Sequence, residues 1–322
     1  MRTGTLLLSI TVALSLLIDS FAAPPPSLDL PGYSGVQMRR GPQNHLLVAV
    51  QVNGRPATFL VDTGSDLSFF RIDRAATFAL IASGDQTFRR GRAFPRAQAS
   101  SLAIGGVELG ATAMALADAS QFRGTAPAAQ GSVDGVIGLD LLGKHKAVIN
   151  CHTRQLFLRR DPNRTLNVAA IAGSLGFVRI PLDETRQGGL TVPINLRGRP
   201  ARLSVDTGAF VTGFDDDALR AFSLKTKPSH LTTRGFDGQI RPVQLAQIDN
   251  LKIGGVAIAP QTFAVMDLYG KKKSLRTHTG IGRIEYYAPR APADRIVGVL
   301  GNELLDQRQA IIDLDSKSLF LK

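Results

Sequence analysis

Two stretches of the sequence decide the fold: Leu60-Val61-Asp62-Thr63-Gly64-Ser65 and Ser204-Val205-Asp206-Thr207-Gly208-Ala209. Each contains the tripeptide Asp-Thr-Gly directly after a strand-like apolar run. A single Asp-Thr-Gly is weak evidence, because composition alone would place one in roughly a tenth of chains of this length. Two copies in the same setting indicate a repeat.

The surrounding sequence repeats together with the tripeptides. Gly-Arg-Pro-Ala precedes both copies at the same spacing, and three further segments of the first half match segments of the second. The matching pairs are 54–57 with 198–201, 102–107 with 251–256, 136–158 with 299–321, and the approach residues Val36 and Met38 with Val178 and Ile180. The chain therefore consists of two copies of one unit, over about 35–160 and 177–322.

Composition favours a mostly β protein. Glycine-rich turns separate short runs of Val, Ile, Leu, Phe and Thr, and few long segments show the 3.6-residue period of a helix. A chain of 322 residues is long enough for two lobes that each bury a core. The predicted strands of the first half are Leu46–Val52, Ala57–Val61, Ser101–Ile104, Val107–Leu109, Ala147–Asn150 and Leu156–Leu158. Short helices are predicted at Arg74–Ala82, around Asp140–Leu142 and at Asp216–Phe222.

Residues 1–22 are predicted to be a signal peptide. Arg2 precedes an apolar run over 6–18, which is short for a membrane span, and Ser20-Phe21-Ala22 offers small residues for cleavage. An uncleaved anchor is the alternative, disfavoured by Asp19 and by the prolines at 24–26. An N-terminal lobe over 23–170 and a C-terminal lobe over 171–322 complete the predicted organisation.

Cysteine usage and charge bear on the compartment and the partners. Cys151 is the single cysteine, so no internal disulfide can form, which favours a bacterial periplasm or exterior for an exported chain. A formal net charge of +12 would suit an anionic envelope surface or an acidic substrate. No nucleic-acid partner is predicted, because the basic residues are dispersed and no base-stacking platform appears. The basic insertion from Lys271 to Arg295 is either a solvated loop or a lip beside the substrate.

The duplicated aspartates point to hydrolysis of amides. Two carboxylates a few ångströms apart repel each other, so that one proton is shared and the pair titrates as a unit. The ionised carboxylate can take a proton from an attacking water while the protonated one donates to the carbonyl oxygen. In each loop glycine permits a tight turn, and threonine provides a hydroxyl that can lock the loop against its mate. We therefore predict Asp62 and Asp206 as the catalytic pair; the alternative is that each aspartate caps a turn.

On these motifs the sequence resembles the pepsin-like and retropepsin-like aspartic peptidases, most of all the bacterial gag-polyprotein-type "aspartyl protease" proteins that carry two such units in one chain. The resemblance covers nearly the whole mature chain. Val136-Ile137-Gly138 and Val299-Leu300-Gly301 match the later apolar-apolar-Gly element of that family, and the residues after each match its short helix. The resemblance implies a mostly β, two-lobed acid-protease fold with the substrate cleft between the lobes.

The resemblance also implies roles for the residues around the aspartates. Thr63 and Thr207 would join the lobes through hydroxyl–backbone bonds, and Gly64 and Gly208 would complete the two turns. Ser65 would hydrogen-bond the first carboxylate. Ala209 has no hydroxyl, so the pair could be asymmetric.

One flap is predicted in each half, between the tripeptide and the following Ile-Gly-Gly turn. The first flap is expected near Phe88–Phe94 and the second near Arg234–Gln239. Gly235 and Phe236 have the composition of a mobile hairpin tip, and Phe236 could cover a bound peptide. An ordinary exposed turn is an equal alternative for this segment.

Other catalytic schemes lack their residues. The chain has no His-Glu-x-x-His spacing, no Gly-x-Ser-x-Gly elbow and no phosphate-binding glycine loop, and no metal or cofactor is predicted. A glycosidase is not usually built from two symmetric, identical loops. The sequence thus predicts an aspartic endopeptidase, a hydrolase of exported or envelope polypeptides that works as a monomer because both halves of the site are in one chain. The alternative is a peptide-binding module without catalysis on the same fold.

Overall fold

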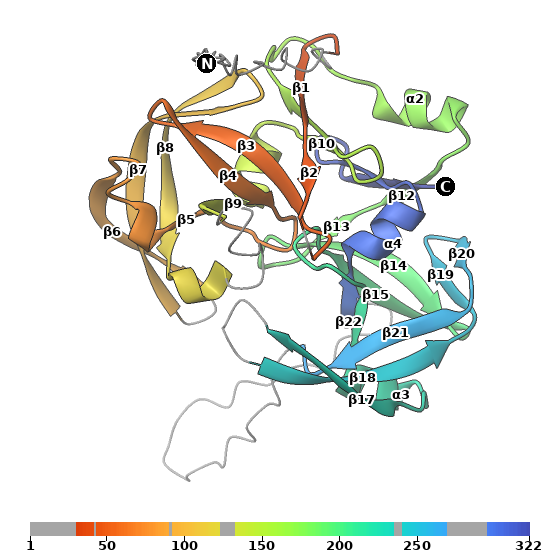
Figure 1. Cartoon of the computed structure of the whole chain (residues 1–322). Helices are drawn as coiled ribbons and strands as arrows, with labels where there is room; N and C mark the ends of the chain where they lie inside the picture. Colours follow the sequence, from red (N-terminus) through yellow and green to blue (C-terminus); the bar gives the residue numbers. More distant parts are fainter. Residues whose placement is uncertain (1–29, 42, 90–91, 123–132, 235–239, 269–294) are drawn as a thin grey trace, which may run out of the picture.

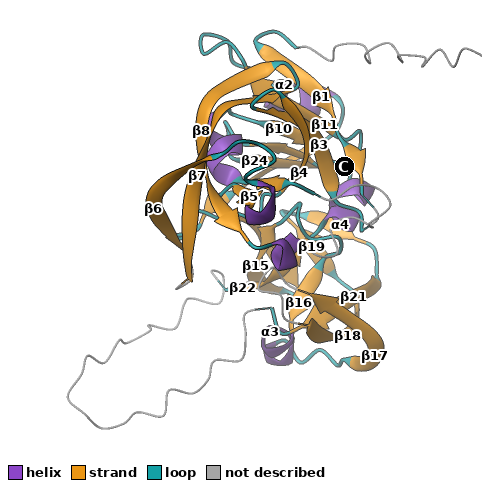
Figure 2. Cartoon of the chain, turned by 60° about the vertical axis from the view of Figure 1, so that its left-hand side comes forward, coloured by secondary structure: helices purple, strands orange, loops and turns teal. Residues whose placement is uncertain are grey.

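The computed structural model describes residues 30–41, 43–89, 92–122, 133–234, 240–268 and 295–322. Its strands form three sheets, one in each of two lobes and one built from both halves of the chain (Figure 1). The helices are short, and strands make up most of the described chain (Figure 2). The predicted mostly β, two-lobed architecture is confirmed.

The eight-stranded sheet forms the N-terminal lobe. In spatial order its strands are β2 (Arg39–Arg40), β3 (Leu46–Val52), β4 (Arg55–Val61), β9 (Gly135–Ile137), β5 (Phe69–Arg71), β8 (Val107–Ala117), β7 (Arg92–Ile104) and β6 (Ile81–Arg89). A two-residue turn joins β3 to β4, and its residues Asn53 and Gly54 have φ values of 50° and 73°. Positive φ at both positions is typical of the type I′ turn, whose twist matches that of paired strands.

The ten-stranded sheet repeats this arrangement in the C-terminal lobe. In spatial order its strands are β17 (Lys227–Arg234), β18 (Ile240–Ile248), β21 (Gln261–Met266), β16 (Gly213–Asp215), β22 (Ile296–Leu300), β15 (Arg199–Val205), β14 (Leu190–Leu196), β19 (Leu251–Ile253) and β20 (Val256–Ile258), with β13 (Asp183–Glu184) paired to β14. The turn between β14 and β15 again has positive φ at both residues, 53° at Arg197 and 83° at Gly198. The duplication in the sequence is thus a duplication of strand pairing.

The six-stranded sheet takes three strands from each half of the chain. In spatial order they are β1 (Tyr33–Gln37), β11 (Gln155–Arg159), β10 (Val148–Asn150), β23 (Ile311–Asp313), β24 (Ser318–Leu321) and β12 (Val178–Pro181). The halves meet at the antiparallel pair β10–β23, where Ile149 lies opposite Ile312. The equivalent strands β1 and β12 lie at opposite edges, so the sheet has an approximate twofold relation between its halves.

Most predicted elements coincide with observed ones. Each predicted strand of the first half overlaps an observed strand, although β7 and β8 extend far beyond the predicted ranges. Two of the predicted short helices are found as α1 (Leu139–Lys144) and α3 (Asp216–Ala221). The remaining helical elements are α2 (Val168–Ser174), α4 (Asn302–Gln307) and the 3₁₀ turns Ile72–Arg74 and Ala119–Phe122.

The helix predicted over Arg74–Ala82 is wrong. The chain makes a short turn there, and Ala79 takes a left-handed φ of 49° while the N–H of Leu80 donates to the carbonyl of Ala75. A left-handed residue, followed by an N–H that donates to a carbonyl one turn earlier, is a common C-terminal cap of a helical turn. From Ile81 onward the chain pairs with β7, so tertiary pairing overrides the local helix propensity of the alanines.

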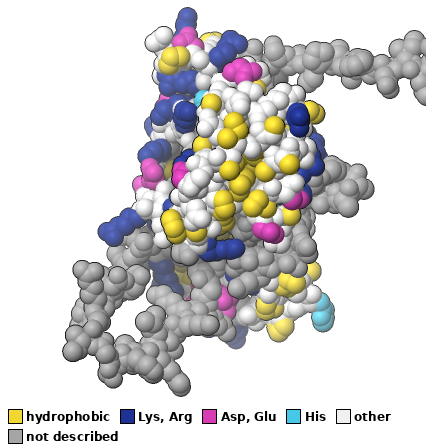
Figure 3. All heavy atoms as spheres, turned by 90° about the vertical axis from the view of Figure 1, so that its left-hand side faces the viewer, with side chains coloured by type: hydrophobic (Ala, Val, Ile, Leu, Met, Phe, Trp, Pro, Cys, Tyr) yellow, Lys and Arg dark blue, Asp and Glu magenta, His cyan; other side chains and the backbone are white. Residues whose placement is uncertain are grey.

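One face of the N-terminal lobe carries exposed apolar side chains. Figure 3 shows hydrophobic side chains gathered in the middle of the face over β6–β8, with lysine and arginine nearer its margins. Ile81 and Phe88, both on β6, are 62% and 72% exposed. Antiparallel sheets can expose one face in this way.

No helix within the described residues is long and apolar enough to cross a membrane. The predicted signal peptide, and the predicted insertion except for its last residue, Arg295, lie outside the described residues.

Candidate active site

The two tripeptides occupy equivalent positions at the ends of equivalent strands. β4 ends immediately before Asp62, and β15 ends immediately before Asp206. Each strand runs parallel to the later apolar strand of its own lobe, β9 or β22. The N–H of Asp62 donates to the carbonyl of Ile137, and the N–H of Asp206 donates to the carbonyl of Leu300, both at 3.0 Å. The apolar-apolar-Gly elements predicted to match the family therefore support the two aspartate loops.

Each aspartate is held by the main chain of its own loop. Oδ1 of Asp62 accepts from the N–H groups of Gly64 at 2.8 Å and Ser65 at 3.2 Å. Oδ1 of Asp206 accepts from the N–H groups of Gly208 at 2.9 Å and Ala209 at 3.0 Å. Two donors on one oxygen orient each carboxyl group and leave its other oxygen for further partners.

The glycine of each loop packs against the aspartate of the other loop. A Cβ added to Gly64 would lie 2.3 Å from Cγ of Asp206, and one added to Gly208 would lie 2.5 Å from Cγ of Asp62. Both distances are far below van der Waals contact, so any side chain here would displace the facing carboxyl group. The glycines are therefore required by this close approach, whereas neither has a φ in the left-handed range that would itself require glycine.

The two threonines join the lobes, as the sequence predicted. Thr63 Oγ1 donates to the carbonyl of Val205 at 2.9 Å and accepts from the N–H of Thr207 at 3.1 Å. The reciprocal bonds run from Thr207 Oγ1 to the carbonyl of Val61 at 2.8 Å and from the N–H of Thr63 to Thr207 Oγ1 at 3.0 Å. Both threonines are fully buried, so each hydroxyl satisfies main-chain groups that water does not reach.

The carboxyl groups of Asp62 and Asp206 form a coupled pair. The pKa of Asp62 is raised well above its ordinary value, first by burial and then by the charge of Asp206 and a hydrogen bond with the Asp206 side chain. The N–H donors of Gly64 and Ser65 act in the opposite direction with smaller effect. A carboxyl group that keeps its proton in this way can donate a hydrogen bond to its neighbour.

The predicted bond from the Ser65 hydroxyl to the first carboxylate is wrong. That hydroxyl donates to the carbonyl of Leu67 at 2.7 Å, and only the main-chain N–H of Ser65 donates to Asp62. Ala209 donates to Asp206 through its own N–H. The main chain supplies this donor in both loops, so the missing hydroxyl at Ala209 removes neither of these bonds. The asymmetry expected from Ala209 is therefore not found in the main-chain bonds to the two carboxyl groups.

In each lobe a hydroxyl residue and a carboxylate form hydrogen bonds beside the aspartate loop. Neither residue of either pair was predicted from the sequence. Ser68 Oγ donates to Asp140 at 2.5 Å and accepts from the N–H of Gly138 at 2.9 Å. In the other lobe the N–H of Thr212 donates to the carboxylate of Glu303 at 2.5 Å, and burial raises the pKa of Glu303. Ser68 is the repeat equivalent of Thr212, and Asp140 of Glu303, so matched polar residues could have revealed them.

Asn302 gives the Asp206 loop an additional contact. It is buried at the start of α4 and donates its side-chain amide to the carbonyl of Thr207 at 2.5 Å. Its repeat equivalent is Leu139, which cannot make such a bond, so no repeat signal marked it.

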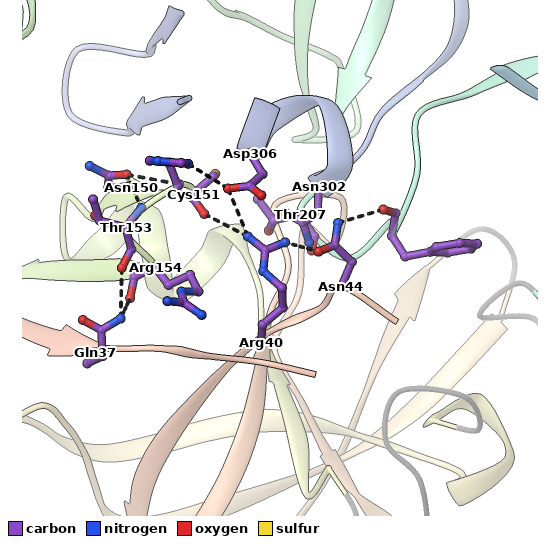
Figure 4. A network of polar contacts seen from close by, with 12 residues as sticks. Gln37, Arg40, Asn44, Asn150, Cys151, Thr153, Arg154, Thr207, Asn302 and Asp306 are labelled. Atoms are coloured by element: carbon purple, nitrogen blue, oxygen red, sulfur yellow. Dashed lines mark hydrogen bonds and ion pairs between the residues drawn. The ribbon is translucent and has the colours of Figure 1, made fainter. Parts of the chain in front are cut away.

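A polar network links the N-terminal lobe to the same loop (Figure 4). Arg40 forms an ion pair with Asp306 of α4 at 3.2 Å and a hydrogen bond with Asn44. Asn44 in turn donates to the carbonyl of Phe210 at 3.2 Å. The loop that carries Asp206 is therefore anchored from both lobes.

The predicted flaps are only partly described. Hairpin β6–β7 occupies the position predicted for the first flap, with β6 ending at Arg89 and β7 beginning at Arg92. Hairpin β17–β18 occupies the position predicted for the second, and its candidate tip residues Gly235 and Phe236 lie outside the described residues.

Comparison with known proteins agrees with this geometry. The family model described as aspartyl protease matches residues 48–141 and 192–304, which is more than half of the chain and includes both tripeptides. No curated protein sequence matches significantly.

Several solved structures are similar to most of the chain, and one to a smaller part of it, all at low sequence identity. Basic 7S globulin from soybean is 12% identical, with a TM-score of 0.51 over 90% of this chain and 94% of that one. An aspartic proteinase from Irpex lacteus is 15% identical, with a TM-score of 0.49 over 90% of this chain and 96% of that one. A retropepsin-like aspartic protease from Rickettsia conorii is 17% identical, with a TM-score of 0.29 over 39% of this chain and 90% of that one. At these identities the soybean protein supports the fold alone.

The match of the family model to both halves, each including its own Asp-Thr-Gly loop, shows that the chain belongs to the aspartyl protease family.

Proposed function

We propose that the chain is an aspartic endopeptidase that hydrolyses peptide bonds with a water molecule activated between Asp62 and Asp206. The observation that carries the proposal is the close approach of the two loops, in which Gly64 packs against the carboxyl group of Asp206 and Gly208 packs against that of Asp62. Burial and the charge of Asp206 raise the pKa of Asp62, and the two side chains lie within hydrogen-bonding reach of each other. A hydrogen bond between two carboxyl groups requires a proton on one of them. The pair therefore retains a proton at a pH at which isolated carboxyl groups have lost theirs.

The chemistry follows from one proton shared by two groups. The ionised carboxylate takes a proton from water as its oxygen attacks the carbonyl carbon of the peptide bond. The protonated carboxyl group donates to the carbonyl oxygen, and a tetrahedral intermediate forms. Its collapse breaks the C–N bond, and the proton that the carboxylate took from water passes to the leaving amine. As the C=O bond re-forms, a hydroxyl of the intermediate returns its proton to the other carboxyl group. Both carboxyl groups then return to their starting state, with one proton between them.

The loops hold this pair in place before a substrate arrives. Main-chain N–H groups fix one oxygen of each aspartate, and the bonds between Thr63 and Thr207 fix one loop relative to the other. Positioned groups of this kind avoid reorganisation during the reaction, which is a main source of enzymatic rate enhancement.

The test is cleavage of a quenched peptide library by the wild-type chain and by Asp62→Asn and Asp206→Asn. Each substitution should reduce the rate to background with little loss of stability, because Asn keeps the size of the side chain. Asp249→Asn is a matched control, since Asp249 is an exposed aspartate whose closest cation, on Arg197, is 4.0 Å away. Wild-type turnover in either dyad variant would refute the mechanism.

The second candidate is a peptide-binding module that does not catalyse hydrolysis. Intact aspartates in both loops favour the enzyme over this candidate. Retention of library peptides without any cleavage, in the wild-type chain across acidic and neutral pH, would favour the binding module instead.

Export and substrate class are part of the proposal. The apolar run over 6–18 and the small residues that follow it support export to a bacterial periplasm or exterior, so that envelope or exported polypeptides would be the substrates. Fractionation of cells that produce the chain, with N-terminal sequencing of the mature form, tests this part.

A further inference from the structure

Two residues at equivalent positions of the repeat differ completely in chemistry. Asp66 lies four residues after Asp62, and Phe210 lies four residues after Asp206. Because Gly64 packs against Asp206 and Gly208 packs against Asp62, the approximate twofold axis that relates the loops passes between the two carboxyl groups. Residues related by this axis lie on opposite sides of a peptide bond held at the carboxyl pair. Asp66 and Phe210 therefore belong to opposite sides of the scissile bond.

The side of Asp66 carries an arginine. Arg89, at the end of β6, forms an ion pair with Asp66 and donates through Nη2 to the carbonyl of Gln187 at 3.2 Å. Gln187 lies between β13 and β14 of the other lobe, so Arg89 joins the first aspartate loop to both lobes. A Cβ added to the neighbouring Gly188 would lie 3.6 Å from Cβ of Asp66 and 3.9 Å from Nη2 of Arg89, which places the three segments in contact.

The guanidinium of Arg89 can bind a second carboxylate. Both of these contacts use Nη2, and its Nε is buried without a hydrogen-bond partner among the described residues. Five N–H donors in a planar fork allow arginine to bind more than one acceptor at once. On the same hairpin Arg96 is paired with Asp85 at 3.0 Å, and Arg92 lies over the ring of Phe94. Among the described residues of this hairpin and Asp66, three arginines therefore face two aspartates, and the net charge is positive.

The side of Phe210 carries an exposed aromatic ring. Phe210 is 41% exposed, although its carbonyl is fixed by the side chain of Asn44. A large apolar side chain that remains exposed beside a fixed main chain presents a surface that a second apolar group can cover, with a gain of about 25 cal/mol per Å² removed from water. The two sides of the site thus offer a cation and an apolar surface.

We propose that Arg89 and Phe210 determine the substrate preference, so that a peptide binds with an acidic side chain on the Arg89 side of the scissile bond and an apolar side chain on the Phe210 side. This inference rests on the proposed function, because it assigns the two sides of the same site. It predicts that the enzyme cleaves in one orientation, with acidic residues enriched on only one side of the cleaved bond.

The test is a cleavage-site profile from a proteome-derived peptide library, read by mass spectrometry. Arg89→Gln should lose the acidic enrichment and keep the apolar one, and kcat/KM for a peptide with Glu over the same peptide with Gln should fall about tenfold, the size expected for a charge-assisted hydrogen bond. Arg89→Lys should retain the acidic enrichment. Phe210→Ala should lose the apolar enrichment on the opposite side and keep the acidic one.

Matched controls separate these effects from general damage. Arg96→Gln removes an arginine and an ion pair from the same hairpin, and Leu175→Ala removes an exposed apolar side chain at the end of α2 that is 56% exposed. Both controls should keep the wild-type profile. A wild-type profile that is the same on both sides, or an acidic enrichment that survives in Arg89→Gln, would overturn the proposal.

A binding readout distinguishes this inference from the proposed function. The same library is incubated with Asp206→Asn, with and without Arg89→Gln, and the retained peptides are sequenced. Acidic peptides retained by Asp206→Asn and lost with Arg89→Gln would support the inference even if the wild-type chain cleaves nothing. Cleavage by the wild-type chain, with no difference in retention between the two variants, would leave the proposed function standing and refute the inference.

Discussion

Replacing Gly208 with alanine is the sharpest perturbation of the site. The added Cβ would lie 2.5 Å from Cγ of Asp62 and 2.6 and 2.7 Å from its two carboxyl oxygens. The φ of Gly208 lies outside the left-handed range, so alanine can adopt the backbone conformation. The effect is therefore confined to the contact with the Asp62 carboxyl group.

The size of the effect follows from these distances. Ordinary contact between a methyl group and a carboxyl group is about 3.5 Å, so the carboxyl group must move by about 1 Å. A displacement of this size in a catalytic group costs about 100-fold in rate. Overpacking at a single contact costs about 1–3 kcal/mol of stability, so the variant should still fold.

The assay compares kcat/KM for Gly208→Ala with that for wild type on one quenched peptide, with thermal unfolding measured in parallel. Gly143→Ala is the matched control, because a Cβ at Gly143 in α1 meets nothing within 4 Å and alanine favours the helix. The control should keep wild-type activity. A folded Gly208→Ala variant that retains activity within about threefold of wild type would show that the close approach of the loops does not position the carboxyl group.

Three further predictions concern stability and reactivity. Thr63→Val and Thr207→Val should each lower the free energy of unfolding by about 1–3 kcal/mol in urea titrations, because buried main-chain groups of both lobes lose their partner; Thr→Ser at the same positions should recover most of the loss. The pKa of Asp62 is raised in the folded state, so the folded chain binds this proton more tightly than the unfolded chain does. The stability that proton binding contributes is therefore lost as the pH rises from the ordinary pKa of 3.8 through the raised pKa. Asp62→Asn should flatten the stability curve over that window, and parallel curves for the two proteins would contradict the assignment. Burial raises the pKa of Cys151 to about 12, so a thiol reagent at pH 8 should label it only after denaturation, and rapid labelling of the folded chain would show that the thiol is accessible.

The fold was predictable where strands carry apolar residues in a regular pattern. β3 was predicted with its observed bounds because its side chains are mostly buried. β6 was missed, since nearly all of its side chains are exposed and its sequence, Ile-Ala-Ser-Gly-Asp-Gln-Thr-Phe-Arg, has no apolar alternation. Pairing with β7 determines that strand, and a partner distant in sequence leaves no local signal.

The site was predictable to the extent that the repeat marks it. Asp62 and Asp206 are brought together by two loops whose sequences are nearly identical, so an internal comparison was sufficient to find them. Asn302 lacks a polar equivalent in the other half, and its contact with Thr207 depends on where α4 packs. Arg89 could not be assigned a role from the sequence, because the ion pair that joins it to Asp66 follows no sequence spacing.

The six-stranded sheet has a consequence for assembly. If the two halves were separate chains, this sheet would be a contact between two molecules. The fraction of chains paired through it would then depend on their concentration. Here residues 160–177, which include α2, connect β11 to β12, so each half meets the other within one chain and the pairing does not depend on protein concentration. Pro162, Asn163 and Arg164 in this connection are exposed. A single proteolytic cut among them would convert a fixed intramolecular pairing of β10 with β23 into a bimolecular equilibrium whose bound fraction falls on dilution.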